Sequence, residues 1–213
     1  MKITAIEPQK HDPDRVSVFV DGEFRMGVSV EIAHAAHLCV GDEVTEARLA
    51  EVERRDRGWQ AREAALHLLA VRPRAAVELA RRLRMKGYEP EVTDEVIERL
   101  RELGMIDDAA FAETVVRDRV RLRPSGARRL ASELRAKGVD EEVAREAIRD
   151  TFEGEGTDER ELALRAAEKW RTRPGEERDR ARRRLHGFLA RRGFGGETIR
   201  EVIDEVLPRD GIE

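Results

Sequence analysis

A helical segment that occurs three times constrains the fold of this chain more than any other feature. The copies read LRMKGY from Leu83, LRAKGV from Leu134 and LARRGF from Leu189. They begin about 50 residues apart, a period typical of proteins that stack supersecondary units in a row. One unit of this length buries too little apolar surface to be robust, so we expect neighbouring units to complete one another's cores.

Each repeat is predicted to contain three helices. In the first repeat Ala61, Ala65 and Leu69 recur every four residues and mark one buried face. The second helix should end at the glycine of the repeated segment, because glycine readily adopts the left-handed conformation that terminates helices. The corresponding first-helix face of the third repeat consists of Leu162, Ala166 and Trp170, and Asp107, Asp140 and Pro90 are suited to helix starts.

The N-terminal segment has a different pattern. Val16, Val18 and Val20 alternate with polar residues, and Asp21-Gly22 is typical of a two-residue hairpin turn. A further strand is expected near Ile3 and Ile6, and Ser29 and Thr45 are suited to capping two helices. The prediction is therefore a mainly α chain, with three tandem three-helix repeats in an elongated curved array preceded by a small β-hairpin/α element. We assign residues 1–57 to the N-terminal element and 58–105, 106–153 and 157–208 to the repeats.

The charge is unevenly distributed. The formal net charge is −4, yet residues 117–137 and 171–192 are strongly basic, whereas 89–102 and 140–155 are acidic. A small negative total does not exclude a polyanionic partner, because local potential decides binding at contact distance. The single Cys39 indicates a reducing compartment, and no apolar stretch is long enough to span a membrane, so we expect a cytoplasmic protein. Because the repeats should contact mainly their own neighbours along the chain, we also expect a monomer.

Basic residues at corresponding places in the repeats are the best candidates for a binding surface. Helix periodicity places them off the leucine face, so all are predicted to be exposed. They are Arg74, Arg84, Lys86, Arg128, Arg129, Arg135, Lys137, Arg180, Arg183, Arg184 and Arg192.

Two explanations compete for these cations. Lys86, Lys137 and Arg192 fall in the last helical turn, where a cation also stabilises the helix dipole, so binding and structural roles both stay open. A second group is placed near helix starts, where the dipole makes a cation unfavourable, and this favours a binding role. That group is Arg128, Arg129, Arg183 and Arg184.

The acidic third helices have a simpler interpretation. Pairs spaced four apart, such as Glu95 with Arg99, are typical of a solvated helix face, which we favour. The alternative is contact with a basic protein surface.

No catalytic or cofactor motif is present in the sequence. There is no glycine-rich phosphate loop, and His34, His37 and Cys39 lack the second ligand pair of a metal site. We therefore predict neither an enzyme nor a bound cofactor.

The chain resembles the regulatory protein RecX family over nearly its whole length. The resemblance rests on ITAIEPQK, the VDGEF hairpin, ELARRLRMKGY, IDDAAFAETVVRDRV and RRLASELRAKGV. Two departures are visible: Arg72-Pro73-Arg74 is followed by Ala75 where the family usually has serine, and the third repeat carries about five extra residues at Gly175–Asp179.

The resemblance implies a non-enzymatic modulator of the RecA recombinase, with roles in recombination, DNA repair and the SOS response. Such proteins lie in the groove of the RecA–DNA filament, with single- or double-stranded DNA, and restrain strand exchange, ATP hydrolysis and coprotease activity. The alternative is a direct duplex-DNA-binding regulator built from helix-turn-helix-like modules. Against it, no helix carries the Asn-, Gln- or Ser-rich surface that reads base edges.

Overall fold

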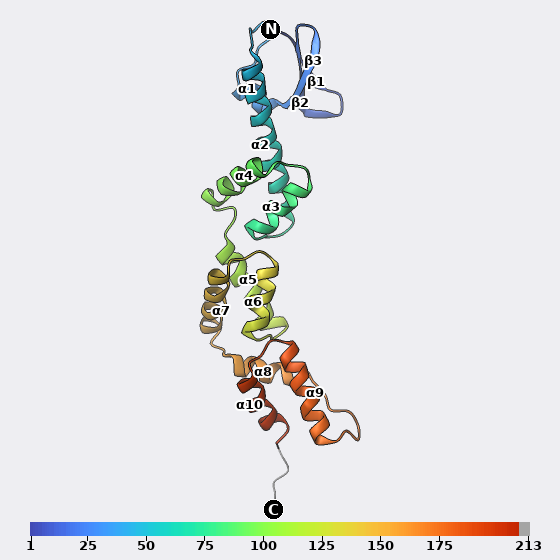
Figure 1. Cartoon of the computed structure of the whole chain (residues 1–213), viewed down its shortest axis with the longest axis vertical. Coiled ribbons are helices and arrows are strands. Elements are labelled where there is room, and N and C mark those ends of the chain that lie inside the picture. Colours follow the sequence, from blue (N-terminus) through green and yellow to red (C-terminus); the bar gives the residue numbers. More distant parts are fainter. Residues whose placement is uncertain (209–213) are drawn as a thin grey trace, which may run out of the picture. The chain divides into compact units, whose positions relative to one another are not determined.

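The computed structural model describes residues 1–208 (Figure 1). The chain forms two compact units. The first unit comprises Met1–Arg72 and Leu79–Met105, and the second comprises Pro73–Glu78 and the chain from Ile106 onward. The fold is mainly helical, with three three-helix repeats after a small N-terminal sheet, as the repeat pattern predicted.

The sheet has three antiparallel strands in the order β1 (Ile3–Gln9), β2 (Asp12–Val20) and β3 (Glu23–Ser29). Asp21 and Gly22 both adopt positive φ, 50° and 89°, and join β2 to β3 in the two-residue hairpin that the sequence predicted. Val18 pairs with Met26, and these buried side chains face the N-terminal core.

Two helices cover this sheet, and both begin at the predicted caps. Ser29 Oγ accepts the Ile32 amide at 3.1 Å to start α1 (Val30–Ala35), and Thr45 Oγ1 accepts the Arg48 amide at 3.2 Å to start α2 (Glu46–Val71). Helix α2 runs through residue 57 without a break. The expected boundary at 57/58 therefore lies inside a helix that the N-terminal element and the first repeat share.

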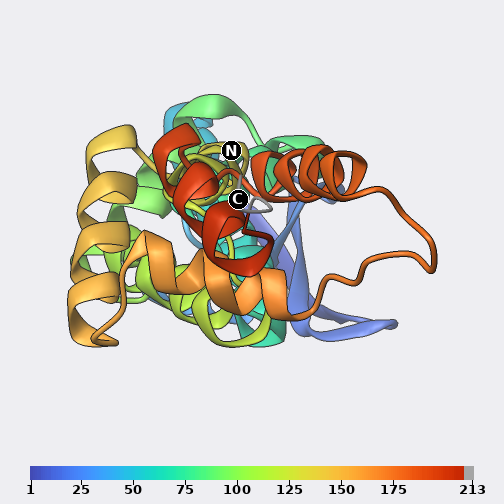
Figure 2. The same ribbon diagram turned by 90° about the horizontal axis from the view of Figure 1, so that it is seen from below.

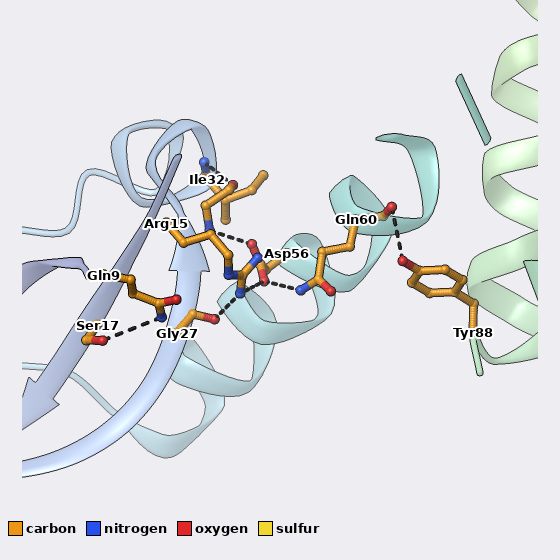
Figure 3. A network of polar contacts seen from close by, with 9 residues as sticks. Gln9, Arg15, Ser17, Gly27, Ile32, Asp56, Gln60 and Tyr88 are labelled. Carbon is orange, nitrogen blue, oxygen red and sulfur yellow. Dashed lines mark hydrogen bonds and ion pairs between the residues drawn. The ribbon is translucent and has the colours of Figure 1, made fainter. Parts of the chain in front are cut away.

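A buried carboxylate fixes the sheet to α2 (Figure 3). Asp56 is 2% exposed and accepts the Ser29 amide at 2.6 Å, an Arg15 Nη2 bond at 2.9 Å and a Gln60 Nε2 bond at 2.7 Å. A buried charge is tolerated inside a protein when it is paired and hydrogen-bonded, as this one is. Tyr88 then donates its hydroxyl to the Gln60 carbonyl at 3.2 Å, which ties the first repeat to the same helix.

The first repeat is completed by α3 (Ala76–Met85) and α4 (Pro90–Glu102). Pro90 occupies the first turn of α4, as predicted. The first turn of α3 belongs to the second unit, whereas Leu79 and Leu83 are buried in the first. The boundary between the two units thus lies inside α3, and not only in the loop between the first and second repeats.

The second unit contains the other two repeats. Its core joins Ala75 to apolar residues from all six helices, among them Leu130, Leu134, Leu185 and Leu189. The helices are α5 (Asp108–Leu122), α6 (Ala127–Ala136), α7 (Glu141–Gly154), α8 (Glu159–Glu168), α9 (Arg178–Arg191) and α10 (Gly196–Val206).

The predicted helix ends are confirmed. Gly87, Gly138 and Gly193 have φ of 95°, 86° and 81°, the left-handed values that terminate the second helix of each repeat. Asp107 accepts the Ala110 amide at 2.9 Å, and Asp140 accepts the Glu142 amide at 2.8 Å. These caps satisfy amides that would otherwise have no partner within the helix.

The third repeat differs from its prediction in two places. Helix α8 ends at Glu168, so Trp170 lies beyond the helix on which it was placed, although it still packs against the core. Helix α9 begins at Arg178 and includes part of the extra segment, because the residues after Glu177 are good helix formers. Figure 2 shows the long loop that joins the two helices.

Candidate anion-binding surface

The predicted cations differ in their surroundings. Lys86, Arg128, Arg180 and Arg183 are exposed, and within the described chain their side chains make no hydrogen bond or ion pair. Arg84 and Arg135 are also exposed, but Arg84 pairs with Asp94 at 2.6 Å, and Arg135 lies 3.6 Å from Glu141. Exposed pairs of this kind contribute little to stability, so all six guanidinium or ammonium groups are accessible to an anion.

Arg74 was predicted to be exposed, and this is wrong. Its side chain is 6% exposed and forms an ion pair with Glu78, 7% exposed, at 2.8 Å. Arg74 precedes the first turn of α3, and that turn packs into the second unit, so the helix-face argument does not apply to it. Arg180, its counterpart by position, lies instead on the exposed surface of α9.

The placement of Arg183 and Arg184 near a helix start is also wrong. Because α9 begins at Arg178, both lie in its second turn, where the helix dipole no longer disfavours them. Arg184 is half-buried: it pairs with Glu176, donates to the Arg171 carbonyl at 2.6 Å and stacks 4.7 Å from the centre of the Trp170 ring. Arg184 therefore holds the loop before α9, and of the two only Arg183 is free to meet a ligand.

Arg128 and Arg129 lie in the first turn of α6, as predicted, but they have different neighbours. Arg128 is unpaired within residues 1–208, whereas Arg129 Nη1 donates to the Arg191 carbonyl of the next repeat at 3.1 Å. Arg192 makes the reciprocal contact: its Nη1 donates to the Pro124 carbonyl at 3.0 Å and its guanidinium lies 4.6 Å from the centre of the Phe188 ring. Lys137, at the C-terminal cap of α6, and Arg192 are both half-buried, so the prediction that they are exposed is wrong.

Burial lowers the pKa of Arg192, and the positive charges of Arg123 and Arg129 lower it further. Arg123 was not among the predicted site residues. The signal was present, because Arg123-Pro124 is one of three Arg-Pro pairs that recur in the sequence. The junction of the second and third repeats thus collects three arginines.

A second group that sequence reasoning missed is structural. Arg119 donates to both carboxylate oxygens of Glu133, at 2.9 and 2.7 Å, and so connects α5 to α6. This two-bond contact lowers the pKa of Glu133 and raises that of Arg119. The basic charge of residues 117–137 is therefore partly neutralised within the repeat.

Lys86 lines an open cavity of about 480 Å³ in the first unit, together with Arg15, His67 and Tyr88. Asp12 and Glu63 line the same cavity, so its charge is mixed. Across residues 1–208, no three His, Cys, Asp or Glu side chains converge as metal ligands, and no helix is long and apolar enough to cross a membrane.

The predicted pair of Glu95 with Arg99 is not formed among the described residues, although the acidic third helices carry other short-range pairs. Arg99 pairs with Glu102 at 2.7 Å, and Arg145 lies 3.5 Å from Glu141. Both are exposed contacts within one helix, as on a solvated face.

The fold and these surfaces define a class of protein: a tandem array of three-helix modules with exposed cations at recurring places, preceded by a small sheet. Four family models match the chain in order. They describe the regulatory protein RecX N-terminal domain (residues 1–45) and the first, second and third three-helix domains of RecX (61–100, 107–148 and 158–203).

Similar proteins carry the same name. The regulatory protein RecX of Prosthecochloris aestuarii is 36% identical over 143 residues, which cover 67% of this chain and 91% of that protein. That of Mycolicibacterium smegmatis is 38% identical over 158 residues, 73% of this chain and 84% of the relative. That of Clostridium botulinum (strain Eklund 17B / Type B) is 27% identical over 209 residues, 97% and 96% of the two chains. The chain therefore belongs to the RecX family of regulatory proteins.

Solved structures have the same fold. A crystal structure of regulatory protein RecX superposes with a TM-score of 0.79 at 24% identity, over 96% of this chain and all of that one. RecX from Lactobacillus salivarius superposes with a TM-score of 0.63 at 24% identity, over 71% of this chain and 97% of the other.

Proposed function

We propose that this protein is a non-enzymatic regulator that binds the RecA–DNA filament and lowers RecA's ATP hydrolysis, strand exchange and coprotease activity. Membership of the RecX family supports the proposal, since the family relatives are named regulatory proteins. It would act in the cytoplasm, where RecA and DNA are found together.

One observation carries the DNA part of the proposal. Exposed cations without a carboxylate partner among the described residues recur along the chain, as Lys86 in the first repeat, Arg128 in the second and Arg183 in the third. Arg128 and Arg183 occupy the same position of successive repeats in the second unit, which suits a ligand with repeated phosphates better than one isolated cation would. Arginine also binds phosphate through two parallel bonds, which lysine cannot do.

We expect the RecA protein of the filament to contact a different face of this chain from the one that contacts DNA. The acidic residues lie on α4 and α7, the third helices of the first two repeats. Lys86 and Arg128 belong to the second helices instead: Lys86 directly follows α3, and Arg128 lies in the first turn of α6. RecA and DNA would then bind to different helices of the same repeat.

RecA's DNA-dependent ATP hydrolysis, measured while this protein is titrated in, tests the proposal directly. We expect the rate to fall to a plateau as the filament is covered, while the protein alone hydrolyses no ATP. An unchanged RecA rate at saturating, folded protein would contradict the proposed function.

Charge reversal tests the basic surface. Arg128→Glu combined with Arg183→Glu should weaken binding to the filament and lower its dependence on salt, by about 0.7–0.9 in the log–log slope for each phosphate that is no longer neutralised. These two residues are chosen because neither holds another part of the described structure. Binding at wild-type affinity and slope would mean that this surface is only solvated.

Binding of duplex DNA in the absence of RecA distinguishes the alternative function from the proposed one. A direct duplex-DNA regulator would bind duplex with sequence preference in the absence of RecA. We expect weak binding without preference, and RecA should be required for tight binding.

A further inference from the structure

Three arginines meet where the second repeat joins the third. The Gly126 amide donates to the Arg192 carbonyl at 2.9 Å, and this hydrogen bond joins the backbones of the two repeats. Across this contact, Arg129 Nη1 donates to the Arg191 carbonyl and Arg192 Nη1 donates to the Pro124 carbonyl, at 3.1 and 3.0 Å. Arg123 directly precedes Pro124, and its positive charge is close enough to Arg192 to lower the pKa of that guanidinium.

None of these three side chains forms a close ion pair with a carboxylate within the described chain, although the positive charge of Arg129 helps to lower the pKa of Glu133. Two carboxylates associated with the junction are occupied: Glu133 holds Arg119 through two bonds, and Glu159 accepts the Ala127 amide at 3.2 Å. Each of Arg129 and Arg192 uses one donor on a backbone carbonyl and keeps the rest of its planar fork. The positive charges of Arg123 and Arg129, which are exposed, therefore act on the half-buried guanidinium of Arg192 and lower its pKa.

The junction of the first and second repeats provides an internal comparison. There the position equivalent to Arg129 is Glu78, and it forms the buried pair with Arg74 at 2.8 Å. The amide at the start of the second helix is also held in the same way, from Ala76 to Asp108 at 2.8 Å. The first junction thus has a paired Glu78 and Arg74 where the second has Arg129 and the uncharged Ser125, so Arg129 adds a positive charge that the first junction lacks at this position.

We propose that Arg123, Arg129 and Arg192 form a clamp for one phosphodiester group of a nucleic-acid backbone. A phosphate offers two non-bridging oxygens with several lone pairs, which three guanidinium groups can reach from different sides. The excess charge that destabilises the empty junction is neutralised on binding. The clamp deepens the proposed function, and rests on it, by naming the place at which the filament's DNA would be held.

Thermal unfolding of the full chain tests the clamp with inorganic phosphate as the probe. Phosphate should raise the melting temperature of the wild type by at least about 2 °C over chloride at equal ionic strength, because it binds only the folded junction. Arg123→Gln should abolish this difference and leave the melting temperature in chloride unchanged or higher, since it removes a repulsion. A purely structural role for Arg123 predicts the opposite, a lower melting temperature in chloride and a phosphate effect that persists. Either result, or no phosphate effect in the wild type, overturns the clamp.

Fluorescence anisotropy with labelled single-stranded and duplex oligonucleotides then tests the identity of the ligand. Arg123→Gln and Arg129→Glu, which introduces the acidic residue that the first junction has at this position, should each lower affinity about tenfold at low salt and reduce the log–log salt slope by about 0.7–0.9. Arg145→Gln, the same charge change on the third helix of the same repeat, should leave both values unchanged. If phosphate stabilises the wild type while DNA binding is the same for the wild type and all three variants, the clamp does not take nucleic acid and the proposal fails.

Measuring RecA's ATP hydrolysis with the same variants distinguishes a failure of the clamp from a failure of the proposed function. If the wild type lowers the RecA rate and the clamp variants bind DNA normally, the clamp is wrong and the function stands. If the wild type leaves RecA unaffected while DNA binding still depends on Arg123 and Arg129, the clamp stands and the function is wrong.

Discussion

The two repeat junctions of the second unit share one backbone design and differ in how tightly it closes. In both, a carboxylate from the next repeat accepts the first amide of a second helix, Asp108 for Ala76 and Glu159 for Ala127. In both, the terminating glycine of the next repeat lies against the start of that helix. Gly138 faces the Val77 side chain, whereas Gly193 faces the Arg129 backbone.

The difference teaches how one sequence pattern can have unequal structural consequences. A Cβ added at Gly193 would lie 2.4 Å from the Arg129 nitrogen, and one at Gly126 would lie 2.3 Å from the Gly193 carbonyl oxygen. At Gly138 the nearest atom is the Val77 Cβ at 2.6 Å, and Val77 is exposed. The second junction is closed by backbone against backbone, whereas at the first the close atoms belong to a single exposed side chain.

Alanine at the three repeated glycines should reveal this gradient, and it is the largest effect we expect. Gly193→Ala should destabilise the protein by roughly 3 kcal/mol or more, because strain at φ 81° adds to the backbone overlap. Gly138→Ala should have an intermediate effect. Gly87→Ala meets nothing within 4 Å and should cost only about 1 kcal/mol, the left-handed strain itself.

Urea unfolding of the full chain followed by circular dichroism measures all three variants. Gly87→Ala serves as the matched control, since it shares the conformation but not the contact. Equal destabilisation at the three glycines would show that conformation alone, and not the junction, requires glycine.

Removing the junction carboxylates should have a smaller effect. Asp108→Ala and Glu159→Ala each leave a helix amide without its acceptor, which should lower stability by about 1 kcal/mol. The destabilisation should be greater at Asp108, whose bond is 2.8 Å rather than 3.2 Å. Glu113→Ala, at a partly exposed helix position where the carboxylate lies 3.6 Å from Arg117, provides the comparison in urea unfolding. Junction variants as stable as that control would mean that water replaces the carboxylates at no cost.

The smallest effect that we expect is on the pH dependence of stability, through Glu133 in the helix that forms the second junction. The Arg119 contact lowers the pKa of Glu133 below its ordinary value of 4.5. A carboxylate whose pKa is lower in the folded state stabilises it above the unfolded pKa, and this contribution is lost as pH falls through the folded pKa. The wild type should therefore lose stability below about pH 4.5 more steeply than Glu133→Gln, in urea unfolding at a series of pH values. Parallel pH profiles would show that the contact is as strong in the unfolded chain.

Much of the fold followed from the sequence because its signals are local. The leucine spacing, the terminating glycines and the caps Ser29, Thr45, Asp107 and Asp140 depend on residues within one turn of one another. The Asp21-Gly22 hairpin was equally readable, since glycine adopts positive φ without a steric penalty. Asp56 could not be read in this way, because its donors come from β2, the start of α1 and α2.

The candidate site was only partly predictable. Lys86, Arg128 and Arg183 are exposed as the helix pattern indicates, whereas Arg74 and Arg184 are held by Glu78 and Glu176. Helix periodicity states which way a side chain leaves its own helix, but not which neighbouring element it meets there.

The sequence by itself determined the number of repeats, the glycines that end the second helices and the separation of basic second helices from acidic third helices. These are properties of short windows, in which apolar spacing and charge are already present. Only the tertiary structure decided which cations stay free, which close a loop and which meet as Arg123, Arg129 and Arg192. Contacts between repeats join residues as far apart in the chain as Arg129 and Arg191, and they depend on the packing of whole helices rather than on any local preference.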